Sequence, residues 1–334
     1  GCAGAAAVLA VLVQLVGIGE ILDALAGIDP AYLLAILSVV LAWLFCWGLA
    51  LRTVLSALDA PLSVWMSGPV FAGAVFSNNV TPFGQAGGEP VSAYLISRAA
   101  DSEYETGLAA IASVDALHFV PSLAYAATGL VYVLAGTPEF GRNLAFAATT
   151  LTVLVVGLPT GAYLAWRFRQ RLERAVVRLV TPVVRAVGRV VPRRSPPEAA
   201  DIERRIDGFF EAIDRVATSR TTLLTALGFS ALGWLAQCLS LWLSVSALGG
   251  ASVPFPVVLL VVPMAAVAGM TPLPGGLGGV EAVQVALLVS TTGLSASVAS
   301  AAVLVHRGAT YLLPTVLGGG VAFALGLGDR SPTG

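Results

Sequence analysis

A long run of residues without a charged side chain, from Thr221 to Val280, limits what this chain can fold into. A single membrane-spanning helix needs only about 20 apolar residues, so this run is far longer than one span requires. Of the 334 residues, 57% are hydrophobic and only 11% are charged, whereas a soluble domain has about 25% charged residues. The apolar stretches are continuous rather than alternating, which favours helices over the strands of a barrel. We therefore predict an all-α polytopic protein that crosses the cell membrane several times.

The run ends in a segment rich in proline and glycine, and Glu281 follows directly. Proline removes a backbone donor and glycine weakens a helix, so this second motif predicts a broken backbone. Broken backbone at membrane depth is tolerated only where it is buried in protein or lines a wet cavity. The alternative is an extramembrane loop, with Glu281 near the positive end of a helix. The backbone candidates of this motif are Thr271, Pro272, Pro274, Gly275, Gly276, Gly278 and Gly279.

A shorter copy of this pattern, the first motif, lies in the N-terminal half and ends at Glu89. Both copies begin with Thr-Pro, continue through glycines to a Gly-Gly pair, and end with a glutamate. Paired Gly/Pro-interrupted segments in two halves indicate a transporter-type binding site built on internal repeats. The backbone candidates of this first motif are Thr81, Pro82, Gly84, Gly87 and Gly88.

The orientation in the membrane follows from residues 167–194, which hold nine arginines and one acidic residue. These residues predict an amphipathic surface helix, and a second one follows with an apolar stripe from Ile202 to Val216. The positive-inside rule places this loop in the cytoplasm. Anionic lipid headgroups are the expected partner of the arginines. Nucleic acid is not expected, because aromatic residues do not alternate with the arginines.

Three parts are thus predicted: residues 1–166 with the first motif, the cytoplasmic loop 167–220, and residues 221–334 with the second motif. Membrane spans are expected at residues 5–18, 31–51, 107–135, 143–166 and 221–248. Residues 296–328 are expected as one long or two short segments, broken near Pro314. With the loop inside, residues 64–98 enter from the cytoplasm and residues 255–292 from outside. These two re-entrant hairpins in a helical bundle form an inverted-repeat arrangement.

The charged residues within the apolar runs are the first candidates for substrate binding. Glu89 and Glu281 can hold an ammonium group or sugar hydroxyls, or carry a proton as the coupling ion. Arg307 can clamp a phosphate with two hydrogen bonds, or form a structural ion pair with either glutamate. The free N–H groups at the ends of the broken segments also suit a phosphate.

Asp115 and His118 are three residues apart and therefore share one helix face. They form either a proton relay or a packing contact. The tryptophans are assigned to the core or to the membrane interface. No metal-ligand spacing and no nucleophile with a histidine partner is seen, so neither a cofactor, a metal nor an enzymatic activity is expected. Further polar candidates for the substrate site are Asn79, Gln85 and Arg98.

These motifs resemble a known family, the flippase-like membrane proteins typified by the transmembrane region of lysylphosphatidylglycerol synthase. The matching pieces are Asn79-x-x-Pro82-x-Gly84-x-x-Gly88-Glu89, then Pro272-x-Pro274-Gly275-Gly276-Leu277-Gly278-x-x-Glu281, and Arg307 with Tyr311 and Pro314. The resemblance implies a helical bundle with re-entrant segments that translocates a lipid or a lipid-linked substrate.

The chain also departs from the family. Phe83 and Pro90 stand where the family often has basic residues, and Asp115 and His118 stand where it commonly has Glu-Arg. Headgroup contacts are therefore expected to differ. The soluble aminoacyl-transfer domain of the bifunctional members is not seen, so we expect that this chain does not make lysyl-lipid itself.

Three functions remain open from the sequence. The first is the flipping of a phospholipid or a lipid-linked saccharide through a polar cavity between the re-entrant segments. The second is the secondary transport of a small soluble solute. The third is an intramembrane enzyme that uses Glu89 and Glu281 as an acid/base pair. A flippase needs a groove open sideways to lipid, whereas a solute transporter needs a sealed central site.

Overall fold

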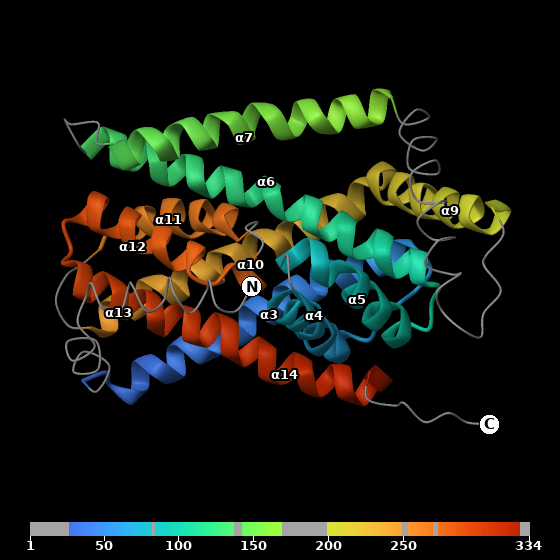
Figure 1. Cartoon of the computed structure of the whole chain (residues 1–334), viewed down its shortest axis with the longest axis horizontal. Coiled ribbons are helices and arrows are strands. Elements are labelled where there is room, and N and C mark those ends of the chain that lie inside the picture. Colours follow the sequence, from blue (N-terminus) through green and yellow to red (C-terminus); the bar gives the residue numbers. More distant parts are fainter. Residues whose placement is uncertain are drawn as a thin grey trace.

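A computed structural model describes residues 27–81, 84–136, 142–168, 199–248, 253–269 and 273–327. Within these ranges the chain forms helices and no strands, as Figure 1 shows. The all-α prediction is therefore confirmed for this part of the chain. The expected span at residues 5–18 and nearly all of the arginine-rich helix 167–194 lie outside the described residues. The division into three parts stays a prediction.

Four segments are long and apolar enough to cross a membrane. They are α3 (Pro30–Ala57), α6 (Tyr104–Gly136), α10 (Arg220–Ala247) and the continuous stretch Ala296–Leu325. The multi-pass expectation is consistent with these segments. Another long helix, α7 (Arg142–Arg167), lies at the edge of the bundle beside α6 (Figure 1).

The last stretch is one long segment rather than two. Helix α13 (Ala296–Arg307) continues through a π-helical turn, Gly308–Leu312, into α14 (Leu313–Ala322). Pro314 lies in the first turn of α14, where it has no N–H to continue the ordinary hydrogen-bond pattern. The expected break near Pro314 thus takes the form of a widened turn, a feature that is frequent at functional sites.

Two pairs of short helices occupy the regions predicted as hairpins. Helices α4 (Val64–Val80) and α5 (Gly84–Ala99) contact each other, and so do α11 (Phe255–Ala268) and α12 (Gly279–Thr292). Each helix has 14 to 17 residues. At about 1.5 Å per residue this is shorter than the roughly 30 Å hydrocarbon core. Their depth in the membrane and the inverted-repeat relation stay predictions.

The glycines of the first motif correct one expectation about the backbone. Gly84, Gly87 and Gly88 lie inside α5 rather than in a broken segment. A Cβ atom on Gly88 would lie 2.1 Å from Asn78 Oδ1 and 2.6 Å from Asn78 N. The lack of a side chain at Gly88 therefore allows α4 and α5 to approach closely, and no unusual dihedral angle is involved.

The centre of the bundle is α10, which contacts α3, α6, α11 and α13. Two buried histidines hold it from either side. The Nδ1 atom of His118 on α6 is 2.6 Å from Ser230 Oγ, and that of His306 on α13 is 3.0 Å from Ser240 Oγ. Ser230 and Ser240 both belong to α10, so each bond fixes a neighbouring helix against it.

The second predicted amphipathic helix is present as α9 (Ala199–Thr218), which packs against α6. Its Arg205 pairs with Glu105 at 2.9 Å, and its Arg215 pairs with Asp59 at 2.9 Å. These pairs are solvent-exposed on at least one side, so each contributes only about 0–1 kcal/mol. Its apolar side, with Val216 buried, provides the rest of the attachment.

The close contact at Gly88 generates the first prediction. Gly88→Ala should lower the thermal unfolding temperature in detergent, because the added methyl group overpacks the α4–α5 contact at a cost of about 1–3 kcal/mol. Gly228→Ala on α10 is the matched control, since a Cβ there meets no atom within 4 Å. It should be neutral or stabilising by up to about 1 kcal/mol. Equal effects of the two variants would contradict the packing explanation.

Candidate functional site

The second motif is held by a buried ion pair between Arg307 and Glu281. Arg307 Nε donates to Glu281 Oε1 over 2.7 Å, and the two side chains are only 16% and 5% exposed. The other carboxylate oxygen, Oε2, accepts from the Gly278 N–H at 2.6 Å. Glu281 is the third residue of α12, so it satisfies a free backbone donor at the helix N-terminus. One carboxylate thus both caps α12 and neutralises Arg307.

The same arginine holds the broken segment that precedes α12. Arg307 Nη2 donates to the Gly275 carbonyl oxygen at 3.0 Å. Gly275 has a φ of 56°, a conformation that favours glycine, and the φ angles of Gly276 and Gly278 are also positive. The predicted break in the backbone is therefore confirmed at these three glycines. A side chain at Gly275 would also collide with the Tyr311 ring, because its Cβ would be 2.5 Å from Tyr311 Cε2.

Asn79 joins the first motif to this network. Its backbone carbonyl accepts from the Tyr311 hydroxyl at 2.9 Å, and its Nδ2 donates to Thr315 Oγ1 at 2.9 Å. The Tyr311 ring also lies 5.7 Å from the Arg307 guanidinium carbon, within cation–π range. Both sequence motifs and the helix that carries Arg307 therefore meet in one set of contacts, which we call the motif network.

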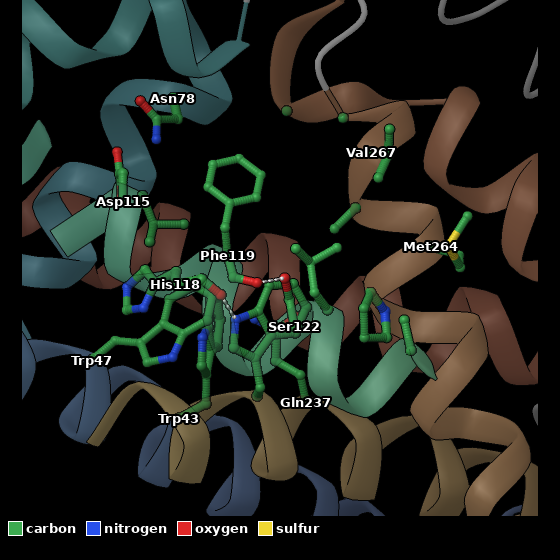
Figure 2. Close-up of a pocket in the computed structure, with 18 of the residues that line it drawn as sticks. Trp43, Trp47, Asn78, Asp115, His118, Phe119, Ser122, Gln237, Met264 and Val267 are labelled. Atoms are coloured by element: carbon green, nitrogen blue, oxygen red, sulfur yellow. Dashed lines mark hydrogen bonds between the residues drawn. The ribbon is translucent and has the colours of Figure 1, made fainter. Parts of the chain in front are cut away.

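A cavity of about 260 Å³ lies next to the motif network (Figure 2). Its wall comes from α3, α4, α6, α10 and α11, with one residue from α7. Asn79 and Gly275 belong to both the network and the wall. In Figure 2, Asn78, Asp115 and His118 lie on one side, and Met264 and Val267 lie opposite. These three polar side chains therefore lie among aromatic residues, since Trp47 and Phe71 pack against His118, and they lie opposite the apolar residues of α11.

Asp115 and His118 both line this cavity, as their shared helix face requires. The His118 ring stacks on Trp47 with 3.9 Å between ring centroids, and its Nδ1 contacts Ser230. Trp234 Nε1 donates to the His118 carbonyl oxygen at 2.9 Å. Among the described residues, His118 Nε2 is a buried nitrogen without a hydrogen-bond partner. The ring is thus fixed in place by its stacking on Trp47 and its contact with Ser230.

The remaining candidates lie elsewhere. Glu89 is half-buried on α5, and Arg307 pairs with Glu281 rather than with it. Arg98 is exposed near the end of α5 and does not line the cavity. Thr81 ends α4 and donates its hydroxyl to Ser77 O. Gln85 lies in the first turn of α5, but its side chain is outside what the structure describes, as are Pro82, Thr271 and Pro272 entirely.

Several residues of the cavity wall were missed from the sequence. Trp43, Trp47 and Trp234 line the cavity, although sequence patterns assigned tryptophans to the core or the interface. Gln237 on α10 lines it as well. An amide within an otherwise apolar span was the available signal, since such a group needs a partner away from lipid. Trp43 and Trp47 are four residues apart on α3, and Trp234 and Gln237 are three apart on α10, but no local spacing links the one pair to the other.

The ion pair generates the second prediction. Arg307→Gln and Glu281→Gln should each destabilise the protein by about 3–5 kcal/mol, because each leaves a buried charge without its partner. The double variant should lose much less than the sum of the two single losses. Thermal or denaturant unfolding of the four proteins in detergent measures this coupling. Strictly additive losses would show that the pair does not hold the network together.

Comparison with known sequences agrees with the motifs. The family model described as lysylphosphatidylglycerol synthase TM region matches residues 1–318. Two UPF0104 membrane proteins of Methanothermobacter thermautotrophicus are similar: one is 25% identical, covering 93% of this chain and 90% of the relative, and the other 26% identical, covering 90% and 86%. A UPF0104 membrane protein of Pyrococcus horikoshii is 26% identical, covering 86% of this chain and 84% of the relative. Because the family match spans nearly the whole chain, this protein belongs to the family of the lysylphosphatidylglycerol synthase transmembrane region.

Proposed function

We propose that this protein translocates the polar headgroup of a membrane lipid from one side of the membrane to the other. The observation that carries the proposal is a mixed polar and apolar cavity whose wall includes α3, α6 and α10, three helices long enough to span a membrane. A headgroup in hydrocarbon loses its hydrogen bonds to water, and a polar wall replaces them. The apolar residues of the wall suit the hydrocarbon next to that headgroup.

The motif network supports a positioning role for Arg307 in this proposal. Its Nε and Nη2 atoms already contact Glu281 and the Gly275 carbonyl, and Arg307 does not line the cavity. This geometry favours the ion-pair alternative over the phosphate clamp. The pair keeps Gly275 in place, and Gly275 forms part of the cavity wall. Arg307 thereby affects lipid passage indirectly, because it holds the backbone of Gly275.

The geometry also favours transport over acyl-transfer chemistry. Ser230 and His118 are within hydrogen-bond distance, as a serine nucleophile and its base would be. Ser230, however, is fully buried and does not line the cavity. A nucleophile must reach the substrate, so this pair is better explained as a helix contact. The family description mentions a lipid synthase, which fits a lipid substrate, and here we propose a carrier of lipid rather than an enzyme.

The third prediction tests whether the cavity is the passage. Ala266 lines the cavity and is exposed, so a larger side chain there fills space without displacing the core. In vesicles containing the purified protein, Ala266→Phe should slow the exchange of a fluorescent lipid between leaflets by about tenfold or more, equivalent to about 1.4 kcal/mol in the barrier. The exchange is followed by quenching of the outer-leaflet fluorophore with a membrane-impermeant reductant.

Ala124→Phe is the matched control, since Ala124 is exposed on α6 and does not line the cavity. It should exchange lipid at the wild-type rate. Wild-type protein that exchanges no lipid above empty vesicles would overturn the proposal. If such vesicles instead accumulate a small hydrophilic solute, and Ala266→Phe blocks that uptake, the function is solute transport.

A further inference from the structure

A second hollow, which we call the α3–α14 groove, lies between α3 and the segment formed by α13, the π-helical turn and α14. Its volume is about 590 Å³, and its wall comes from residues 28–37 and 304–316. All eleven described wall residues are isoleucine, leucine, valine, alanine or glycine, and none of them lines the cavity. The described wall therefore offers no side chain that forms a hydrogen bond or an ion pair.

The chemistry of a ligand follows from this wall and from where it lies. A polar group in the groove would lose its hydrogen bonds to water and gain none from the described side chains. Helix α3 and the stretch Ala296–Leu325 are both long and apolar enough to cross a membrane, and lipid hydrocarbon surrounds such segments. Leu312 and Val316 line the groove and are still 61% and 71% exposed, so it is open on their side. A hydrocarbon chain fits both the wall and its surroundings.

Gly308 leaves part of the groove unfilled. It is the first residue of the π-helical turn, it lines the groove, and a Cβ atom there would meet no atom within 4 Å. Lipid chains are as apolar as leucine, so the hydrophobic effect does not move a chain from the bilayer into the groove. Van der Waals attraction does, because a concave wall contacts a chain on more sides than a convex helix surface. These contacts favour a chain that stays in one defined place.

Protein segments fit this groove less well than a lipid chain. A helix of the fourteen residues 5–18, the first span expected from the sequence, would be about 21 Å long and about 10–12 Å wide. These dimensions correspond to roughly 2,000 Å³, whereas the groove holds about 590 Å³. A helix from a second copy of the chain meets the same limit. Such a helix would cover the opening and leave the space beside Gly308 empty, whereas a single acyl chain is thin enough to enter it.

We propose that the α3–α14 groove binds an acyl chain of a membrane lipid, at a site separate from the cavity proposed for translocation. The bound chain contacts Gly308, Ala309 and Leu312 of the π-helical turn. Tyr311 of the same turn donates to the Asn79 carbonyl oxygen in the motif network. The chain thereby packs against the turn that supplies this contact. This inference does not depend on the proposed lipid translocation.

The experiment uses vesicles that contain the full chain and a phospholipid with a photoactivatable diazirine in one acyl chain. After irradiation, mass spectrometry of the peptides locates the lipid adducts. We expect adducts at residues 304–316 about tenfold more often than on the exposed side of α7, at Val153 and Val156. About ten additional carbon contacts supply a preference of this size. Equal labelling of the two surfaces would show ordinary contact with bulk lipid only and would overturn the proposal.

A variant that fills the groove assigns the effect to it. Gly308→Leu places a side chain in the free space, so adducts at residues 304–316 should fall about tenfold while those on α7 stay unchanged. Gly320→Leu on α14 is the matched control, since a Cβ there also meets no atom within 4 Å and Gly320 does not line the groove. It should keep the wild-type labelling. Size-exclusion profiles and unfolding temperatures show whether both variants fold.

A cross-linking experiment separates the lipid from protein occupants. With Leu312→Cys in the groove, oxidation tests for a disulfide to Leu12→Cys in the expected first span, or to Leu312→Cys of a second copy. We expect neither disulfide in vesicles at the lipid content used for labelling. Efficient formation of either one, with wild-type adducts no more frequent than on α7, would show that protein fills the groove and would overturn the proposal.

Discussion

The structure depends on how one buried guanidinium is compensated. Arg307 lies in an apolar segment, where an isolated charge costs at least about 3 kcal/mol. Glu281 supplies the counter-charge and the Gly275 carbonyl supplies a further acceptor. The same carboxylate caps α12 through the Gly278 N–H. Glu281 therefore neutralises the arginine and also accepts a hydrogen bond from a backbone N–H that would otherwise be unpaired. These contacts fix the shape of a segment that its proline and glycines prevent from being a regular helix.

This fixed segment contributes Gly275 to the cavity wall. Gly275 and Asn79 belong both to the motif network and to the cavity wall. Tyr311, one turn after Arg307, contacts both of them. Arg307 itself does not line the cavity, so the role that we propose for its ion pair is to hold the backbone of a wall residue.

Much of the fold followed from the sequence, because long apolar runs and charged ends determine where helices of this kind lie. The expected spans at 31–51, 107–135 and 221–248 correspond to α3, α6 and α10. The structural role of each glycine was harder to predict, since the lack of a side chain permits either an unusual dihedral angle or a close contact between helices. Gly275 needs the first and Gly88 the second. The sequence offered two glutamates as partners of Arg307 and could not choose between them, and it did not place the tryptophans at the cavity, because both depend on contacts between helices distant along the chain.

The central claim is that the cavity beside the motif network is an aqueous, polar site and not a gap in a dry core. Ser122 lines it and is 6% exposed, whereas Ser244 on α10 is 0% exposed and does not line it. In a background without native cysteines, the most direct test measures how fast a small water-soluble thiol reagent modifies Ser122→Cys and Ser244→Cys. We expect rapid modification of Ser122→Cys and protection of Ser244→Cys in the folded protein. Equal protection of both would contradict it.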